Sequence, residues 1–512
     1  MKWFFPPSLP LALACCIAAG AAPAATVTIG NAFIGFDPVN GDTLHAGSFE
    51  GGDGTIVVDS GTVVNLNAGS SPDLAQAAPA FNVGRAGPVG ALTITGPGSA
   101  VNVETGATGL SARVGDDGGV GVLRILNGGA LNLSASAQPV DEESTAFISV
   151  GRASGFGTVL LDDGSLTIDN QLAPRLWIGR EGGVGTVRAV NGSTISLLER
   201  TGFEDASGAA IVVGRNAAGD VQGSAVGGVG SLFIDDSTVS VTSLADRARL
   251  DIARDAGTKG TFEAANGSMV SVEAPDAVFS VANGVRSEGS AALDAGASLR
   301  VNGDRSRVRI ADAADASGSF AAANGAAITV EGADAAFVVA RGLNSEASAT
   351  FEEGATLLVK GDVARLGITD ESEGAEGELR LRSGAVARVE GAQAVVFVAT
   401  STTAATAGAT GVLRMDGGAR LEVDGDTSRL VVGFREGNDG TVIVESGAEI
   451  VVTTRADNTT IRIGDALTDL GFPVSGTGAL TVSGEGSRVA TNGGAHVGAP
   501  LQIGGGKSSG VL

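Results

Sequence analysis

Paired carboxylates are the residues of this chain best suited to catalysis, and they occur at Asp116/Asp117, Asp162/Asp163 and Asp235/Asp236. Two carboxyl groups that face each other across a groove can cleave a glycosidic bond, one as acid and the other as base or nucleophile. Neighbouring residues of a strand or turn point in different directions, so an adjacent pair does not form such a dyad. The chain also has no Tyr and only two Trp for stacking on sugars. The sequence therefore predicts no catalytic residue, and a polysaccharide lyase or glycosidase acting on extracellular glycans is the alternative.

Arginine also recurs, after the apolar strand ends, at Arg85, Arg152, Arg180, Arg215 and Arg254. A row of guanidinium groups along one side of a protein could bind an anionic ligand. Recurrence is, however, what any internal repeat produces, and acidic residues occur at the same corners. An exposed ion pair contributes about 0–1 kcal/mol. We therefore predict that these arginines are solvated charges beside corner acids.

Signals for metal or phosphate binding are weak. Residues 51–59, GGDGTIVVD, resemble one copy of a calcium-binding nonapeptide, but such sites need tandem copies to complete the oxygen shell. His45 and His496 lie near opposite ends of the chain and are predicted to be exposed polar residues. The glycine-rich stretch at 182–185 lacks both a following Lys-Ser/Thr and a helix that would hold phosphate. The sequence predicts no metal site and no cofactor, with structural calcium as the open alternative.

All of these residues belong to a repeated apolar pattern that runs along nearly the whole chain. Each copy contains G-x-h-x-h-x-x-G-x-x-h-x-h, where h is apolar, and residues 440–452 are the clearest example. A strand precedes the pattern, and a 58-residue double repeat, 260–310 echoed by 318–368, is the clearest duplication. The residue two places before the last inward position of that strand is apolar in every copy, which predicts strands with one buried face. The last inward residues are Val83, Val114, Val150, Ile178, Val213, Ile252, Val281, Ile310, Val339, Ile368, Val398, Val432, Ile463 and Ile503.

A glycine, often preceded by Asn, Asp or Ser, marks the turn between the second and third strand of each copy. Asn-Gly is also the strongest hairpin signal, so antiparallel folds must be considered. A β-sandwich needs about 100 residues around one core and a propeller blade needs four strands, whereas this unit has about 30 residues and three strands. The sequence therefore predicts an all-β fold, a right-handed parallel β-helix of about 14 three-stranded coils whose aliphatic residues stack. The turn glycines, expected to need positive φ, are Gly164, Gly192, Gly267, Gly296, Gly325, Gly354, Gly384, Gly417 and Gly447.

The first part of the chain differs from this repeat. Residues 1–25 combine Lys2, an apolar stretch and an A-x-A site at 22–24, which predicts a secretory signal peptide. Both cysteines, Cys15 and Cys16, lie inside it, and a lipoprotein signal with lipid on Cys16 is the alternative. Residues 26–48 are expected to cap the solenoid, which occupies 49–512. No later apolar run approaches the ~20 residues of a spanning helix, so we predict no integral membrane segment in the mature chain.

Three phrases of the repeat carry a resemblance: VGRAGPVGALTI at 83–94, VGDDGGVGVLRILNGGALNL at 114–133 and IGREGGVGTVRAVNGSTI at 178–195. They resemble the passenger repeats of bacterial autotransporters and related β-helical surface proteins of Gram-negative bacteria. The resemblance implies an adhesin or surface structural component, secreted or associated with the outer membrane. Members of this family continue into a translocating barrel or a sorting signal, but this sequence stops at IGGGKSSGVL, residues 503–512. We therefore expect a truncated product that ends in an incomplete coil.

Charge and loop lengths suggest how such a rod would meet other molecules. The formal net charge is −24, which repels nucleic acid and anionic lipid, so no nucleic-acid partner is predicted. Loops that leave one face of a solenoid vary without disturbing its ladders. The longest insertions, predicted to be the contact sites, are 134–145, 199–208, 217–227 and 400–408. We expect a non-catalytic scaffold that contacts cell-surface, matrix or polysaccharide ligands through these loops.

Overall fold

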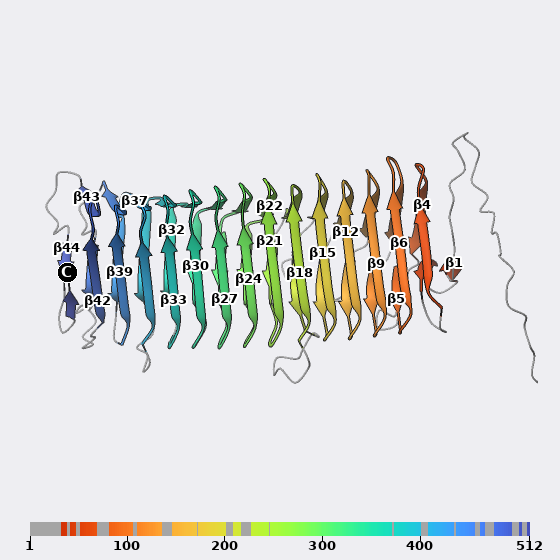
Figure 1. The fold of residues 1–512 in the computed structure, drawn as a ribbon, viewed down its shortest axis with the longest axis horizontal. Helices are drawn as coiled ribbons and strands as arrows, with labels where there is room; N and C mark the ends of the chain where they lie inside the picture. The colour runs from red at the N-terminus through yellow and green to blue at the C-terminus, as the bar shows by residue number, and fades with distance from the viewer. Residues whose placement is uncertain are drawn as a thin grey trace, which may run out of the picture.

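The strands of this protein stack into a long rod, as the computed structural model in Figure 1 shows. Every regular element among the described residues is a β-strand. The predicted signal peptide at 1–25, with both cysteines, lies outside the described residues. The structure describes residues 32–37, 41–47, 52–68, 81–105, 110–135, 146–170, 173–200, 208–216, 227–244, 246–370, 373–400, 408–434, 437–455, 461–465, 476–493, 501–503 and 509–511.

Each coil contributes one strand to each of three parallel stacks. The first-strand stack contains β2 (Gly41–Ala46), β5 (Phe81–Arg85), β8 (Leu110–Asp116), β11 (Ala146–Arg152), β14 (Arg175–Arg180), β17 (Ala209–Arg215), β20 (Arg247–Ile252), β23 (Asp276–Val281), β26 (Arg307–Ile310), β29 (Asp334–Val339), β32 (Val363–Asp370), β35 (Gln393–Thr400), β38 (Arg429–Phe434), β41 (Ile461–Asp465) and β44 (Leu501–Ile503). The second-strand stack contains β3 (Gly54–Val58), β6 (Val89–Thr95), β9 (Val120–Leu126), β12 (Phe156–Asp162), β15 (Val184–Val190), β18 (Val229–Asp235), β21 (Lys259–Ala265), β24 (Glu288–Leu293), β27 (Ser317–Ala322), β30 (Glu346–Phe351), β33 (Glu376–Leu381), β36 (Thr410–Met415), β39 (Asp439–Glu445), β42 (Thr477–Ser483) and β45 (Ser509–Val511). The third-strand stack contains β4 (Val63–Ala68), β7 (Ala100–Thr105), β10 (Ala130–Ala135), β13 (Ser165–Asn170), β16 (Thr194–Glu199), β19 (Thr238–Ser243), β22 (Met269–Glu273), β25 (Ser298–Asn302), β28 (Ala327–Glu331), β31 (Thr356–Lys360), β34 (Val386–Glu390), β37 (Arg420–Gly425), β40 (Glu449–Thr454) and β43 (Arg488–Gly493).

This architecture is the predicted right-handed parallel β-helix, and the predicted register is confirmed. Val83 lies opposite Val114 in the next coil, and Ile463 lies opposite Ile503 at the far end. Every intermediate pair of inward residues on the first strands also matches. Because the strands are in register, each internal strand has its backbone groups paired on both sides. The insertions between coils therefore leave the ladders unchanged.

The first described strands start the stack earlier than the repeat pattern alone indicates. β1 (Ala32–Asp37) pairs antiparallel with β2, and β2 pairs in parallel with β5, with Ala46 opposite Val83. A strand of the first stack thus lies inside the segment 26–48 that was expected to form a cap. Within the part of the chain that the structure describes, no helix has the length and apolar character needed to cross a membrane.

The turn between the second and third strands uses two consecutive residues with positive φ. Asn266 has φ 54° and Gly267 has φ 75°, and the Ser268 N–H donates to the Ala265 carbonyl at 3.1 Å. These features are typical of the type I′ turn that Asn-Gly favours. Here, however, the two strands enter different stacks instead of pairing with each other. Gly164 is an exception to the predicted positive φ: its Cα lies against the preceding coil, and a Cβ there would be 2.4 Å from the Ile125 carbonyl oxygen.

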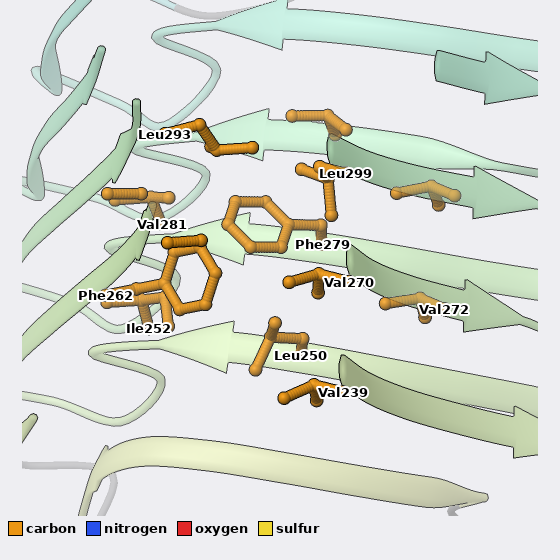
Figure 2. Packing of buried hydrophobic residues seen from close by; sticks show 14 of the residues in the cluster. Val239, Leu250, Ile252, Phe262, Val270, Val272, Phe279, Val281, Leu293 and Leu299 are labelled. Atoms are coloured by element: carbon orange, nitrogen blue, oxygen red, sulfur yellow. The ribbon is translucent and has the colours of Figure 1, made fainter. Parts of the chain in front are cut away.

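The interior is one column of buried apolar side chains enclosed by the three stacks. Figure 2 shows Leu250 and Phe279 from first strands packed beside Val239 and Val270 from third strands. In the middle coils the expected aliphatic ladders also contain aromatic rings, because phenylalanine occurs there in alternate coils. In the second-strand stack, Phe320 lies between two alanines of the adjacent coils, and in the first-strand stack Phe279 and Phe337 are two coils apart. Alternating large and small side chains fill the column, which gives the 58-residue double repeat a physical cause. The clustered phenylalanines are Phe262, Phe279, Phe320, Phe337 and Phe351.

Candidate functional site

The three acid pairs are built into corners, where other side chains already bind them. Asp116 is only 1% exposed and accepts a hydrogen bond from Arg113 Nη1 at 2.9 Å. Its carboxylate also lies 3.5 Å from Arg152 Nη1 and 3.7 Å from Arg85 Nε. Asp117, in contrast, is exposed and has φ 52°. The first acid of this pair is therefore the centre of an ion-pair cluster, and the second forms part of the turn.

The other two pairs share one arrangement with each other. Asp162 accepts a hydrogen bond from Asn191 Nδ2 at 2.7 Å, and Asp235 accepts one from Asn266 Nδ2 at 2.6 Å. In both, the donor belongs to the following coil. The second acid of each pair occupies the turn position with positive φ, at Asp163 (51°) and Asp236 (46°). These carboxylates link neighbouring coils. Among the described residues, no group of three or more His, Cys, Asp and Glu side chains could hold a metal ion.

The recurring arginines form a column that the sequence reading described incompletely. Arg85, Asp116, Arg152, Arg180 and Arg215 occupy equivalent positions in five successive coils. Asp116 replaces an arginine within the column, which explains why three arginines converge on it. Arg254, the fifth predicted arginine, lies 3.7 Å from Asp251 and 3.9 Å from Asp255.

These arginines are paired as expected, but they are only partly exposed to solvent. Glu181 joins Arg152 at 2.9 Å and Arg180 at 2.7 Å, while Arg215 lies 3.7 Å from Asp255. Burial is the main cause that lowers the pKa of Arg215 to about 10, and repulsion by Arg180 lowers it further. The guanidinium stays charged at neutral pH, since its pKa remains well above 7. The column is a half-buried ion-pair network, which corrects the prediction of solvated charge.

One tryptophan joins this network, and the sequence reading did not find it. Trp177 lies on the outer side of β14 yet is only 5% exposed. Its ring centroid is 4.4 Å from that of Phe147, and the guanidinium carbons of Arg180 and Arg215 lie 4.4 and 4.3 Å from it. Stacked cations on an indole contribute about 0.5–2 kcal/mol each. The signal was present, because Trp177 immediately precedes the inward residue Ile178 and so must point outward.

The calcium-like segment and the described histidine both serve as structural contacts. Asp53 accepts a hydrogen bond from the Val89 backbone N–H at 3.0 Å, which satisfies the first donor of β6. His45 was expected to be exposed, but it is half-buried, and its Nδ1 lies 3.2 Å from Asn82 Nδ2. Burial lowers the pKa of His45, and the charge of Arg85 lowers it further. His496 lies outside the described residues.

A groove of about 930 Å³ runs along the outer face of the second-strand stack from β18 to β36. Its floor is low because small side chains stand in register there, among them Ser290, Ser319 and Ser348. Glu346 and Glu376 stand at its rim in adjacent strands. Single-sequence reasoning missed this feature, since it depends on which outward residues are short in consecutive coils.

The four long insertions predicted as contact sites lie almost wholly outside the described residues. Comparison with known proteins gives little further information. No protein-family profile and no curated protein matches the chain. One solved structure to which it is similar is the hyper-glycosylated TibA 55–350 fragment, whose glycosylation TibC catalysed. That chain is 14% identical, the alignment covers 88% of this chain and 97% of that chain, and the TM-score is 0.26. A TM-score of this size supports no inference about function.

Proposed function

We propose that this chain is a passenger-type β-helical protein, secreted or held at the surface of a Gram-negative bacterium, with a structural or adhesive role and no catalysis. The main support is the uninterrupted register of the first-strand stack from β2 to β44. Parallel ladders of this length make a stiff, extended scaffold whose surface loops vary without disturbing the core. The phrases at 83–94, 114–133 and 178–195 add the family resemblance.

The contacts with other surfaces are made by the insertions between coils. β8 and β11 stay in register although residues 136–145 separate β10 from β11, and β35 pairs with β38 although residues 401–409 separate β35 from β36. A rod that keeps its register across insertions can present several loops at fixed spacing. Several weak contacts on one rigid body bind together with higher avidity than any one of them. The expected ligands are cell-surface, matrix or polysaccharide molecules.

Loop replacement tests this role. Residues 136–145 and 401–407 are each replaced by Gly-Ser, and binding to immobilised collagen, fibronectin and bacterial polysaccharides is measured by biolayer interferometry. We expect at least one ligand to bind the intact chain and to be lost from a loop variant whose circular dichroism and melting temperature are unchanged. Binding that survives in both variants, or an intact chain that binds none of the panel, would contradict the adhesive role.

Export is tested separately. Expression of the full chain in a Gram-negative host should yield a product beginning at Ala25 or Thr26, as the site at 22–24 predicts. N-terminal sequencing of the product found outside the cytoplasm decides this. A product that starts at Met1 and stays in the cytoplasm would remove the surface role. A lipidated Cys16 at the N-terminus would instead favour the lipoprotein alternative.

A glycan-cleaving enzyme is the second candidate, and the groove is the observation that favours it. Glu346 and Glu376 are opposite each other in adjacent strands at its rim. Glycosidases use two carboxyl groups about 5–9.5 Å apart. Release of reducing ends from a panel of acidic and neutral polysaccharides, abolished in Glu346→Gln and Glu376→Gln, would establish this activity. No release from any of them would exclude it.

A further inference from the structure

Four turns between second and third strands contain the dipeptide Asn-Gly, and they lie in alternate coils, after β9, β15, β21 and β27. In each turn the asparagine has φ between 51° and 55°, and the glycine has φ between 75° and 80°. All of these residues are exposed to solvent. Asn-Gly is chemically labile, because glycine has no side chain to keep its nitrogen away from the asparagine amide carbon. The four dipeptides are Asn127-Gly128, Asn191-Gly192, Asn266-Gly267 and Asn324-Gly325.

The reaction open to an Asn-Gly dipeptide is ring closure between its two residues. The glycine nitrogen forms a bond with the side-chain amide carbon of asparagine, and the bond from that carbon to Nδ2 breaks. Ammonia leaves with the proton that the glycine nitrogen gives up. Water then opens the five-membered imide at one of its two carbonyls, which gives aspartate or isoaspartate, whose backbone runs through the former side chain. Water is the only co-reactant, and the exposed turns have access to it.

The following coil holds the nitrogen that would attack. In all four turns the glycine N–H donates a hydrogen bond to a backbone carbonyl at the same corner of the next coil. The nitrogen must lose this proton and turn toward the asparagine side chain before it can react, and the hydrogen bond opposes both steps. The bonds run from Gly128 to Asp163 (2.5 Å), from Gly192 to Asp236 (2.6 Å), from Gly267 to Ala295 (3.0 Å) and from Gly325 to Glu353 (3.1 Å).

The preceding coil holds the group that would be attacked. Each asparagine donates from Nδ2 to an oxygen of the coil before it, and three of these acceptors are aspartate carboxylates. Both reacting groups are therefore restrained, one by each neighbouring coil. The bonds run from Asn127 to Thr95 Oγ1 (3.3 Å), from Asn191 to Asp162 (2.7 Å), from Asn266 to Asp235 (2.6 Å) and from Asn324 to Asp294 (2.5 Å).

We propose that these four turns are modification sites controlled by the stacking of the coils. Each asparagine is inert in the intact rod and converts to isoaspartate or aspartate when the following coil detaches. Detachment of one coil needs no global unfolding, because each coil of a solenoid contacts only its neighbours. The proposal does not depend on the adhesive role, because the reaction needs only water and the chain itself.

The product weakens the stack that protected the asparagine. At Asn266 the new carboxylate replaces a hydrogen-bond donor to Asp235 with a like charge, which is destabilising between neighbouring strands. At Asn127 the new carboxylate faces the Thr95 hydroxyl, which can donate a hydrogen bond to it. Modification therefore marks a lost coil contact at every site, and it opposes repair of that contact at the three sites that face an aspartate.

Peptide mapping by mass spectrometry, with isoaspartate detected by an isoaspartyl methyltransferase, tests the proposal. The full chain is kept at pH 8 and 37 °C, either folded or unfolded in guanidinium chloride. Each of the four asparagines should react at least about tenfold more slowly in the folded chain. Equal rates in the folded and the unfolded chain would overturn the proposal.

Two matched core variants test the control by the following coil. Val150 and Val339 are fully buried in the coils that follow Asn127 and Asn324, respectively. Val150→Asp should accelerate the reaction of Asn127 and leave Asn324 protected, and Val339→Asp should do the reverse. Equal acceleration of both asparagines in both variants would show that the reaction follows global unfolding, and the proposal would be wrong.

Variants that carry the product carboxylate test its effect on the stack. Asn266→Asp should lower the melting temperature at pH 8, whereas the matched control Asn127→Asp should change it little, since the two asparagines occupy the same turn position and differ in the group they face. Adding Asp235→Asn to Asn266→Asp should restore the melting temperature, because one donor then again faces one carboxylate. Equal losses in Asn266→Asp and Asn127→Asp, or no rescue by the second substitution, would show that modification does not oppose repair through the facing acid.

Discussion

The two halves of this rod differ in which connection between strands is short. In the first half, three residues join first to second strands, as at 117–119 and 153–155, while third strands lead into longer connections such as 136–145. In the second half, two residues join third to first strands, as at 274–275 and 332–333, and the first strands lead into longer connections such as 282–287. The change occurs around β17 to β20. Most coils therefore have one tight corner and one permissive corner, whereas β17 and β41 have long connections on both sides.

Glycine is found at most of the tight corners, although the one at 274–275 is formed by Ala274 and Pro275. In the first half, Gly151 has φ 67°, and a Cβ there would lie 2.0 Å from the carbonyl oxygen of Val184. The equivalent position in the second half is Ala282, with φ 56° in a wider turn. The tight corner of the second half has Gly332, where a Cβ would lie 1.6 Å from the Gly303 carbonyl oxygen. The comparison shows that close backbone stacking, and not the fold as such, requires the glycine.

The switch also places the loops on two edges of the rod. The insertions at 134–145 and 199–208 follow third strands, but those at 217–227 and 400–408 follow first strands. A ligand that uses loops of both halves would have to reach around the rod.

The largest expected effect comes from the core, which both halves share. Val150→Asp and Ile310→Asp each put an unpaired charge into a fully buried position and should destabilise the rod by at least about 3 kcal/mol. Hydrogen exchange of the flanking strands is the proper measurement, since a solenoid need not unfold in one step. Thr356→Asp, at an exposed position, is the control. Very different losses in the two halves would mean that they do not share one core.

Exchanging glycine and alanine at the corners should give a smaller but asymmetric result. Gly151→Ala and Gly332→Ala should each cost about 2–3 kcal/mol, because both glycines have positive φ and the new Cβ meets backbone of the next coil at Gly151 and of the preceding coil at Gly332. Ala282→Gly should change stability by about 1 kcal/mol or less, as relief of positive φ offsets lost packing and added chain entropy. Urea midpoints of the three variants check this. Equal costs in Gly151→Ala and Ala282→Gly would contradict two kinds of corner.

Insertion of a five-residue Gly/Ser segment should also distinguish the two kinds of corner. At a tight corner it should lower the free energy of unfolding by about 2 kcal/mol. Between Gly118 and Gly119 it would break the bonds from Gly118 N–H to Ala153 and from Gly119 N–H to Asp116, each worth about 1 kcal/mol. Between residues 140 and 141 the same insertion only lengthens the connection from β10 to β11, at about 0.6 kcal/mol or less. Thermal unfolding of the two insertion variants provides the measurement. If both are equally tolerated, the three-residue connection is not a constraint.

The sequence predicted the ladders well because their cause is local and repeated. Two inward residues of one parity in every coil determine the register, so Val83 to Ile503 could be aligned without a structure. The outer surface could not be obtained in the same way. Asp116 lies in the arginine column because Gly115, which has positive φ, turns the chain just before it. Trp177 is buried because Phe147 and Arg215 of the neighbouring coils cover its ring. The groove could be found only by comparing the sizes of outward side chains in consecutive coils, whereas the repeat pattern records only the inward residues.

The smallest expected effect is a dependence of stability on pH at a permissive corner. In the first half, the third strands β13, β16 and β19 end in the buried polar residues Asn170, Glu199 and Ser243, which pair in register from coil to coil. In the second half, glycines such as Gly332 occupy this corner. Burial raises the pKa of the Glu199 carboxyl, so the folded chain keeps this proton to higher pH than the unfolded chain does. Stability therefore falls as pH rises from the ordinary glutamate value through the raised one, and it stays lower above it.

Glu199→Gln removes this charge but keeps an oxygen that can accept from the Ala173 N–H. The variant should be more stable than the wild type at pH 8 and should lose this advantage at pH 4, where the wild-type carboxyl is protonated in the folded and, increasingly, in the unfolded chain. Urea midpoints at the two pH values measure the difference. Glu390→Gln, on the surface of β34, is the control and should show no such change. A Glu199→Gln variant that is less stable at pH 8 than at pH 4, relative to wild type, would mean that this carboxylate is stabilised by its hydrogen bonds more than it is penalised by burial, and that the polar corner of the first half is as well adapted as the glycine corner of the second.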